Sequence, residues 1–458
     1  MLALKKLFAP IDMTEGAPWK KLVAFTVPML IGNVFQQLYS TVDAIIVGRY
    51  VGDHALAAIS STGAVFFLLL VFFIGISSGA GIMVSQYFGA KKREELSRTI
   101  GACITLLTLC GVVVMVFAPM ITRPLLVLLD TPPEILDWAC SYMNILLWGI
   151  HGVVYFNILT GILRGMGDSV SPLLYLIISS AVNVALDILF IPILGMGVAG
   201  AAVATIIAQF ISGILCIRRL LQMRDVFDFG AKYLAPKKEY ITQVMKLGMP
   251  TGASQAVFSL AMVLVQSLTN SFGPMVIAAY GIVMRIDGFV MMPVFSFSNA
   301  IMVFTGQNVG AGKLDRVKQG TKQCAIMAVG TAVVIVIGIV VFGGHMAGLF
   351  TATGEIITMT LRFLRILSLG YIGMALSQVV WGVIRGAGDV MTPMWASFIT
   401  TVGIRVPAAY MLVHFTGKPD SIVLSLLITW LIGTVYGIVA YRIGKWRSKG
   451  IVKQNETI

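Results

Sequence analysis

Hydrophobic residues form long continuous runs along the chain, and polar residues gather in short stretches between these runs. Each run approaches or exceeds the roughly 20 residues that an α-helix needs to cross a bilayer. The runs do not alternate polar and apolar positions, as the strands of a membrane β-barrel do. The pattern predicts an all-α polytopic membrane protein whose twelve transmembrane helices lie at residues 18–47, 55–84, 99–121, 134–163, 170–193, 198–217, 241–271, 274–305, 320–342, 355–384, 390–415 and 421–443.

The composition excludes most other classes of protein. Hydrophobic residues make up 58% of the 458 residues and charged residues only 12%, whereas a soluble domain carries about 25% charged residues. The mean hydropathy is +0.91. Twelve spans and their loops use nearly the whole chain, so we expect no sizeable water-soluble domain. The sequence contains no Walker loop and no nucleophile or zinc spacing, so we expect no enzyme and no cofactor.

The Lys and Arg residues of the chain are distributed unevenly between the two sides of the predicted spans. A net charge of +13 would suggest nucleic acid as a partner of a soluble protein. Here most Lys and Arg lie on the side of the two termini, and only Arg49, Arg123 and Lys418 lie in loops on the other side. The positive-inside rule therefore predicts cytoplasmic termini in the plasma membrane, which in a bacterium is the inner membrane. We expect the bilayer and no nucleic acid as partner, and a monomer.

An internal repeat divides the chain into two halves. A shift of 221 residues places 161–168 on 382–389 and 86–90 on 307–311. The constant offset indicates a duplicated six-span unit, and an even number of spans gives both copies the same orientation. The copies are therefore expected to be related by a pseudo-two-fold axis along the membrane normal. We predict an N-terminal six-helix lobe at 1–217, a cytoplasmic linker at 218–240, a C-terminal six-helix lobe at 241–445 and a cytoplasmic tail at 446–458.

The best-matched segment of the repeat reads R-G-x-G-D followed by proline, between the fourth and fifth spans of each half. In the first half we expect its glycines to form a sharp turn and Arg164 to pair with Asp168 at the cytoplasmic rim. The proline would lie near the start of the next helix. Two lobes of this kind could expose a cavity to each side of the membrane in turn, which is alternating access.

Polar residues within the first, fifth and sixth spans occur at helical spacing. A carboxylate inside a span is costly unless it faces a cavity or a partner. Carboxylates, an amide, a hydroxyl and a backbone carbonyl make an oxygen-only set, which suits a proton or a small hard cation. The set comprises Gln36, Tyr39 and Asp43 in the first span, Asn183 and Asp187 in the fifth, and Ala201 and Thr205 in the sixth.

The second half does not repeat this set. Under the shift, Asp187 corresponds to Ala408 and Asn183 to Ile404. This difference argues against a second cation site of the same kind.

The eighth span carries a different group of residues. The candidate contacts for a transported substrate are Met284, Arg285, Asp287 and Met291, because methionines make adaptable surfaces. Asp287 could form a structural salt bridge with Arg405 of the eleventh span, or it could attract a cationic compound.

The paired R-G-x-G-D loops and the segment 36–48 together resemble the multidrug and toxic compound extrusion (MATE) family over essentially the whole chain. The main rival with two parallel six-span halves is the major facilitator superfamily. Its G-x-x-x-D-R-x-G-R loop has no match at 89–96. The resemblance implies secondary active export of organic, mostly cationic compounds in exchange for sodium ions or protons.

The resemblance also implies roles for particular residues. Family members build a cation site from an Asp of the first helix, an Asn and an Asp of the fifth and a Thr of the sixth. The matching residues here are Asp43, Asn183, Asp187 and Thr205, with Gln36, Tyr39 and Asn157 as polar neighbours. A purely structural polar cluster is the alternative. Acids that some members carry in the seventh and tenth helices are missing here.

Two other functions remain open from the sequence. A lipid-linked precursor flippase would be expected to have a strongly cationic cavity and often extra spans. A passive channel would show flux that does not depend on an ion gradient. Transport in liposomes under an imposed gradient would distinguish these functions from antiport.

Overall fold

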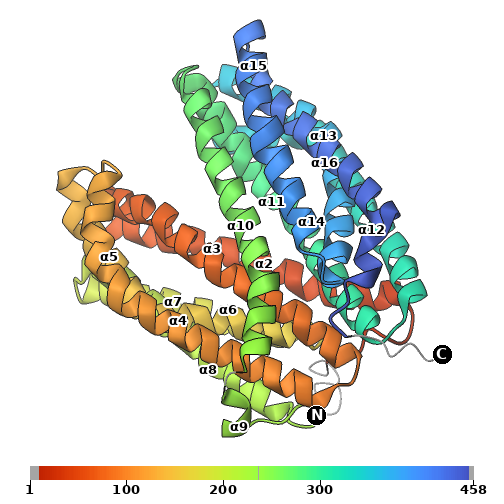
Figure 1. The fold of residues 1–458 in the computed structure, drawn as a ribbon. Helices are drawn as coiled ribbons and strands as arrows, with labels where there is room; N and C mark the ends of the chain where they lie inside the picture. The colour runs from red at the N-terminus through yellow and green to blue at the C-terminus, as the bar shows by residue number, and fades with distance from the viewer. Residues whose placement is uncertain (1–9, 236, 453–458) are drawn as a thin grey trace. The chain divides into compact units, whose positions relative to one another are not determined.

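The computed structural model describes residues 10–235 and 237–452, and within these residues every regular element is a helix (Figure 1). The predictions for residues 1–9 and for 453–458 of the tail lie outside the described residues. The first half contains α2 (Pro18–Tyr50), α3 (Asp53–Gly89), α4 (Arg93–Leu128), α5 (Pro133–Trp148), α6 (Ile150–Gly165), α7 (Val170–Ile188), η1 (Leu189–Ile193), α8 (Gly197–Gln222) and the short α9 (Ala231–Leu234). The second half contains α10 (Lys238–Asn270), α11 (Pro274–Gly310), α12 (Leu314–Gly348), α13 (Gly354–Gly386), α14 (Met391–Phe398), η2 (Ile399–Arg405), α15 (Val406–Thr416), α16 (Asp420–Ile443) and η3 (Lys445–Ser448).

The helices confirm the predicted spans. Within the described residues, eleven helices are long and apolar enough to cross a membrane, and α5 and α6 together would make a twelfth span, bent by 52°. The bend falls at Gly149, between the two helices. Two further spans contain π-helical segments, η1 after α7 and η2 between α14 and α15. A helix satisfies its own backbone hydrogen bonds, which is what the bilayer interior requires.

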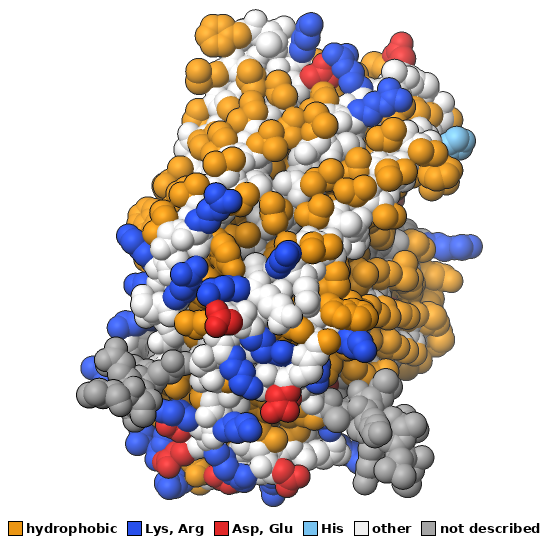
Figure 2. All heavy atoms as spheres, turned by 90° about the vertical axis from the view of Figure 1, so that its right-hand side faces the viewer, with side chains coloured by type: hydrophobic (Ala, Val, Ile, Leu, Met, Phe, Trp, Pro, Cys, Tyr) orange, Lys and Arg blue, Asp and Glu red, His pale blue; other side chains and the backbone are white. Residues whose placement is uncertain are grey.

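Large apolar side chains on the outer faces of the helices fit a lipid environment. Met120 of α4 is 72% exposed and Val334 of α12 is 69% exposed. Figure 2 shows hydrophobic side chains covering large areas of the face in view. A soluble monomer rarely exposes apolar patches of such extent. These faces are therefore expected to contact acyl chains.

Contacts divide the chain into two compact units. Unit 1 comprises Pro28–Gly252 with the segment that ends at Asp12, and unit 2 comprises Met13–Val27 with Ala253–Ile458. The divisions of α2 and α10 fall beside prolines inside these helices, Pro28 and Pro250. A proline within a helix removes a backbone hydrogen bond and favours a kink. The predicted lobes at 1–217 and 241–445 follow the repeat and stay a prediction.

The repeat is visible in matched contacts inside each unit. In unit 1 the Ser77 hydroxyl donates to the Asn157 carbonyl at 2.7 Å, and in unit 2 the Ser298 hydroxyl donates to the Gln378 carbonyl at 2.7 Å. Ser77 and Ser298 are 221 residues apart in the sequence, and so are Asn157 and Gln378. Two separate hydrogen bonds with the same geometry support a duplication of structure as well as sequence.

Glycines allow these helices to approach closely. A Cβ added at Gly161 of α6 would lie 2.6 Å from the Ser77 hydroxyl oxygen of α3, and one added at Gly382 of α13 would lie 2.5 Å from the Ser298 carbonyl oxygen of α11. Small residues four apart are typical of tight helix packing in membranes, and Gly165 and Gly386 extend the same faces. The first glycines of the repeated segment therefore serve packing. The turns themselves use Gly167 and Gly388.

The R-G-x-G-D turns differ in part from the sequence expectation. Gly167 and Gly388 adopt φ of +91° and +99°, which confirms the expected sharp turn. The Asp168 carboxylate accepts hydrogen bonds from the Ser171 backbone N–H at 2.9 Å and from the Ser171 hydroxyl at 2.7 Å. Its ionic partner is Arg219 of α8 at 2.8 Å. The expected pairing with Arg164 was wrong, because the carboxylate faces α8 and the next helix.

The linker between the halves is attached to unit 1. The Arg93 guanidinium donates to the Asp228 carboxylate at 2.7 Å and to the carbonyl oxygens of Asp225 and Arg224. The hydrogen bond from Arg93 lowers the pKa of Asp228 below its ordinary value. The Thr105 hydroxyl donates to the Leu234 carbonyl at 2.7 Å. The predicted linker is thus held against α4 at several points.

Candidate functional site

Two carboxyl groups from different helices meet inside unit 1. Asp43 comes from α2 and Asp187 from the last turn of α7, and their carboxyl groups are hydrogen-bonded to each other. Asp187 is completely buried and Asp43 is half-buried. A hydrogen bond between two carboxyl groups needs a proton on one of them. Two carboxylates this close resist joint ionisation, so a proton or a cation between them would stabilise the pair.

An amide and a hydroxyl support this pair. In the orientation that satisfies its hydrogen bonds, the Asn183 amide nitrogen donates to Asp187 Oδ2 at 2.7 Å, and its oxygen accepts from the Thr205 N–H at 3.1 Å. The Thr205 hydroxyl donates to the Ala201 carbonyl at 2.9 Å. Tyr39 forms a side-chain hydrogen bond with Thr205. Spacing on α7 and α8 thus brings the predicted residues of the two helices together.

Two oxygen atoms of the carboxyl pair can still accept a hydrogen bond or bind a cation. The Oδ1 atoms of both Asp43 and Asp187 are buried and accept no other hydrogen bond among the described residues. Oxygen donors of this kind match the ligand preference of sodium and of other hard cations. No cluster of three or more His, Cys, Asp or Glu occurs in the described part of the chain. The donor set thus fits a proton or a singly charged hard cation better than a transition metal.

Two further residues, Gln36 and Asn157, were predicted as polar neighbours of the carboxyl pair. Gln36 is exposed on α2. The Asn157 side chain donates to the Val153 carbonyl of its own helix at 2.8 Å, and its carbonyl accepts the Ser77 bond between α3 and α6. Asn157 therefore has a packing contact here.

A tyrosine that the sequence reading missed lies beside the pair. Tyr142 of α5 is buried and interacts electrostatically with Asp43, Tyr39 and Asp187. A buried phenol usually needs a polar partner. Tyr142 lies in an apolar run of the predicted span 134–163, so the sequence pattern does not single it out.

Unit 2 holds a different buried polar cluster. Asp287 of α11 interacts electrostatically with the buried Tyr371 and with Arg405 at the end of η2. The Arg405 guanidinium is buried, lies against Tyr280 and contacts the Met262 sulfur at 3.4 Å. This cluster carries one acid and one fixed cation, where unit 1 carries two acids. The two charges are thus balanced within the protein.

The remaining substrate candidates lie on α11 with Asp287. Met284 and Met291 are three and four residues from Asp287 and therefore share its helix face. Met284 is half-buried, whereas Met291 is buried in the core of unit 2. The exposed Arg285 lies over the Phe350 ring at 5.8 Å.

Comparison with known proteins gives the same picture over the whole chain. The family model described as MatE matches residues 28–189 and again residues 250–411. The probable multidrug resistance protein YoeA of Bacillus subtilis is 32% identical, with 96% of each chain covered. The probable multidrug resistance protein NorM of Thermotoga maritima is 26% identical, with 94% of each chain covered.

Solved structures agree on the fold. A crystal structure of MATE in complex with MaL6 superposes with a TM-score of 0.89 at 24% identity and covers 94% of this chain and 97% of the other. An outward-facing structure of a multidrug resistance MATE transporter of the MOP superfamily also gives 0.89 at 24% identity, with 95% and 97% covered. At this identity the likeness shows the fold alone. The double match of the family model coincides with the internal repeat.

Proposed function

This chain belongs to the MatE family of multidrug efflux transporters, and on that premise we propose that it is an antiporter that exports amphipathic, mostly cationic organic compounds in exchange for sodium ions or protons. The observation that carries the proposal is the hydrogen-bonded pair of Asp43 and Asp187. Such a pair holds one positive charge at a time and releases it only when its surroundings change. That is the behaviour an antiporter needs from its coupling site.

Each residue of the site has a defined part in this proposal. Asp43 and Asp187 take up the proton or cation, and Asn183 fixes the orientation of Asp187 through the 2.7 Å hydrogen bond. Thr205 links Tyr39 of α2 to α8. For sodium, the oxygen donors would be the two carboxylates, the Asn183 amide, the Thr205 hydroxyl and the Ala201 carbonyl. The bound charge would then tie α2 to α7.

The coupling of ion binding to substrate export follows from this contact between α2 and α7. When the site is charged, α2 is held to α7 by the shared proton or cation. When the site is empty, two carboxylates repel one another and favour another position of α2. A compound that binds the second arrangement better is exchanged against the ion, because a ligand shifts a conformational equilibrium only through differential affinity. The duplicated six-helix organisation supports alternating access as the framework.

Substrate selectivity is proposed to come from adaptable apolar contacts with few charges. Met284 and Asp287 lie three residues apart on α11 and are our candidates for contact with a cationic compound, with Arg285 and Met291 as further candidates. The relatives are described as multidrug resistance and multidrug export proteins, which supports a broad substrate range. We further propose a monomer in the plasma membrane with cytoplasmic termini.

Purified protein in liposomes tests the proposal. A fluorescent organic cation is followed under an imposed sodium gradient and, separately, under an imposed proton gradient. Antiport requires uphill movement of the cation with one of the gradients. Equal flux without any gradient would indicate a channel. A lipid-linked precursor moved in place of the cation would indicate a flippase.

A further inference from the structure

The two R-G-x-G-D loops end in equivalent aspartates with different surroundings. In unit 1 the Arg219 guanidinium forms a salt bridge with the buried carboxylate of Asp168. In unit 2 Asp389 accepts the equivalent bonds from the Thr392 N–H at 3.1 Å and the Thr392 hydroxyl at 2.7 Å. The shift of 221 places Ala440 where the first repeat has Arg219. The second repeat therefore lacks the side chain that fills this place in the first.

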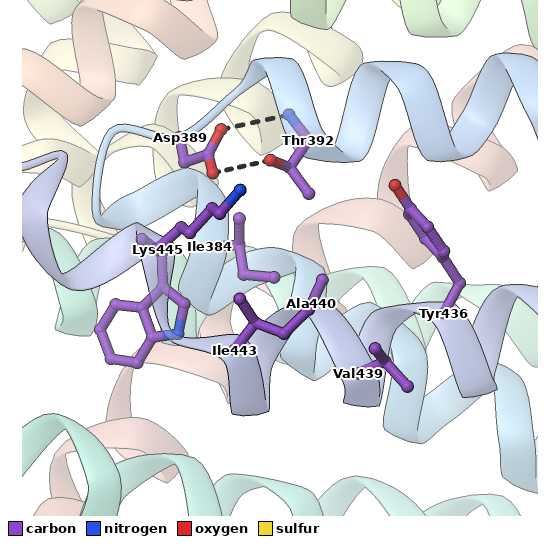
Figure 3. A pocket seen from close by; sticks show the side chains of 9 residues that line it. Ile384, Asp389, Thr392, Tyr436, Val439, Ala440, Ile443 and Lys445 are labelled. Atoms are coloured by element: carbon purple, nitrogen blue, oxygen red, sulfur yellow. Dashed lines mark hydrogen bonds between the residues drawn. The ribbon is translucent and has the colours of Figure 1, made fainter.

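A cavity of about 190 Å³ occupies the corresponding place in unit 2. Asp389, Thr392, Ala440 and Lys445 line it, and the Lys445 side chain points toward Asp389 and Thr392 (Figure 3). Asp389 is only 7% exposed. The structure records no ion pair between the described side chains of Asp389 and Lys445, although both face this cavity. A cavity of this size accommodates several water molecules or a small polar group.

The chain after α16 builds the far wall of the cavity. Gly444 ends the helix with a φ of +76°, and the chain turns back so that Lys445 and Trp446 line the cavity. The buried Trp446 indole stacks on Tyr441 at 5.4 Å and donates to the Tyr441 carbonyl at 3.0 Å. This wall is therefore held in place by its own contacts.

The position of the cavity indicates an amphipathic ligand. It lies at the end of α13, the start of α14 and the end of α16, where three predicted spans reach the membrane surface. Val439 and the 63% exposed Ile443 line it and continue onto the outer face of α16. Aromatic side chains such as Tyr436 and Trp446 are typical of this depth. A ligand here would have a polar end in the cavity and an apolar end against α16.

The charges define the polar end. Asp389 offers a carboxylate to a cation that donates hydrogen bonds, and Lys445 offers an ammonium group to an anion. Phosphoethanolamine carries a primary ammonium and a phosphate that are joined by a two-carbon linker. Phosphocholine has no N–H to donate, and phosphoglycerol has no cation. Pockets with basic residues at the ends of membrane helices are known to suit lipid phosphates.

We propose that this cavity binds the head group of phosphatidylethanolamine, with its ammonium group at Asp389, its phosphate near Lys445 and its acyl chains along α16. The proposal concerns a lipid site in unit 2 and does not depend on the coupling ion. In the first repeat, Arg219 supplies the cation for Asp168 from within the chain.

Native mass spectrometry of the purified full-length protein tests this site. The protein is exchanged into mixtures of phosphatidylethanolamine, phosphatidylcholine and phosphatidylglycerol, and retained lipids are counted. We expect preferential retention of phosphatidylethanolamine by the wild type. Ala440→Arg restores the arginine of the first repeat and should lower that retention about tenfold, which is about 1.4 kcal/mol. Asp389→Asn should lower it to a similar degree.

Controls keep the test decisive. Arg442→Gln lies on the same turn of α16 but outside the cavity lining, and it should retain the lipid as the wild type does. Thermal unfolding of each variant identifies any that fail to fold, and Ala440→Arg is not expected to be one of them. Equal retention of the three lipids, or unchanged retention in Ala440→Arg, would overturn the proposal. Displacement by soluble glycerophosphoethanolamine at equal concentration would overturn the assignment to a lipid.

Discussion

The carboxyl groups of Asp43 and Asp187 are hydrogen-bonded to each other within unit 1, although one belongs to the first predicted span and the other to the fifth. In the proposed function, this contact joins α2 to α7 through a single shared proton or cation. Loss of that charge leaves two adjacent carboxylates in a medium of low polarity, which is unfavourable. The position of α2 is therefore expected to depend on whether the site is occupied.

Replacement of Thr205 distinguishes sodium from protons. Thr205→Val keeps the shape of the side chain but removes a hydroxyl oxygen that sodium would use and a proton would not. With sodium as coupling ion, we expect the sodium concentration for half-maximal transport to rise about tenfold, which is about 1.4 kcal/mol. Thr331→Val, a similar change on α12, is the control. Unchanged sodium dependence in Thr205→Val would remove this hydroxyl from a sodium site.

The glycine contact between α11 and α13 should be sensitive to a single methyl group. Gly382→Ala places a Cβ 2.5 Å from the Ser298 carbonyl oxygen, so the helices must separate. We expect a loss of about 1–3 kcal/mol in the free energy of unfolding, the usual effect of overpacking. Gly338→Ala on α12 has nothing within 4 Å and should be neutral or slightly stabilising. Thermal unfolding in detergent measures both, and equal stability of the two variants would refute the close packing.

The ion pair of Asp168 and Arg219 should matter more than an exposed pair. The Asp168 side chain is 1% exposed, so Arg219→Gln leaves a buried carboxylate with no cation. We expect a loss of about 3–5 kcal/mol. Arg123→Gln breaks a pair whose side chains are 62% and 79% exposed, and the loss of stability should be far smaller because water screens exposed charges. Chemical unfolding of both variants is the measurement, and similar losses in the two would contradict the burial argument.

Cysteine labelling in intact cells tests the proposed topology. In a background without the native cysteines, single cysteines at 89–98, 218–235 and 445–452 should react only after the membrane is made permeable. Cysteines replacing Asp53, Thr131 or Lys418 should react with an impermeant reagent added outside, because the positive-inside rule places them there. Outside labelling within 218–235 would reverse the topology.

Local patterns in the sequence were sufficient to predict the spans and the repeat. A long apolar run predicts a spanning helix because the thickness of the bilayer sets its length, whatever the run later packs against. Asp43 and Asp187 were also predictable as members of one set, because isolated acids in spans are costly and must find partners.

Long-range contacts were not predictable in the same way. Arg219 lies in the basic linker region by sequence, and only the packing of α8 against the loop brings it to Asp168. The break at Gly149 and the π segments η1 and η2 depend on how the helices pack. Tyr142 lay in an apolar run, where a single phenol does not change the pattern.

Transport by variants of the carboxyl pair tests the central claim most directly. Uptake of a fluorescent organic cation into proteoliposomes is measured for the wild type, Asp43→Asn and Asp187→Asn under separate sodium and proton gradients. Asp315→Asn is the control, because Asp315 is exposed and its carboxylate forms an ion pair with Lys318. We predict that both variants fold and bind the compound but lose gradient-driven transport, while Asp315→Asn behaves as the wild type. Wild-type rates in Asp43→Asn and Asp187→Asn would contradict the assignment of the coupling site.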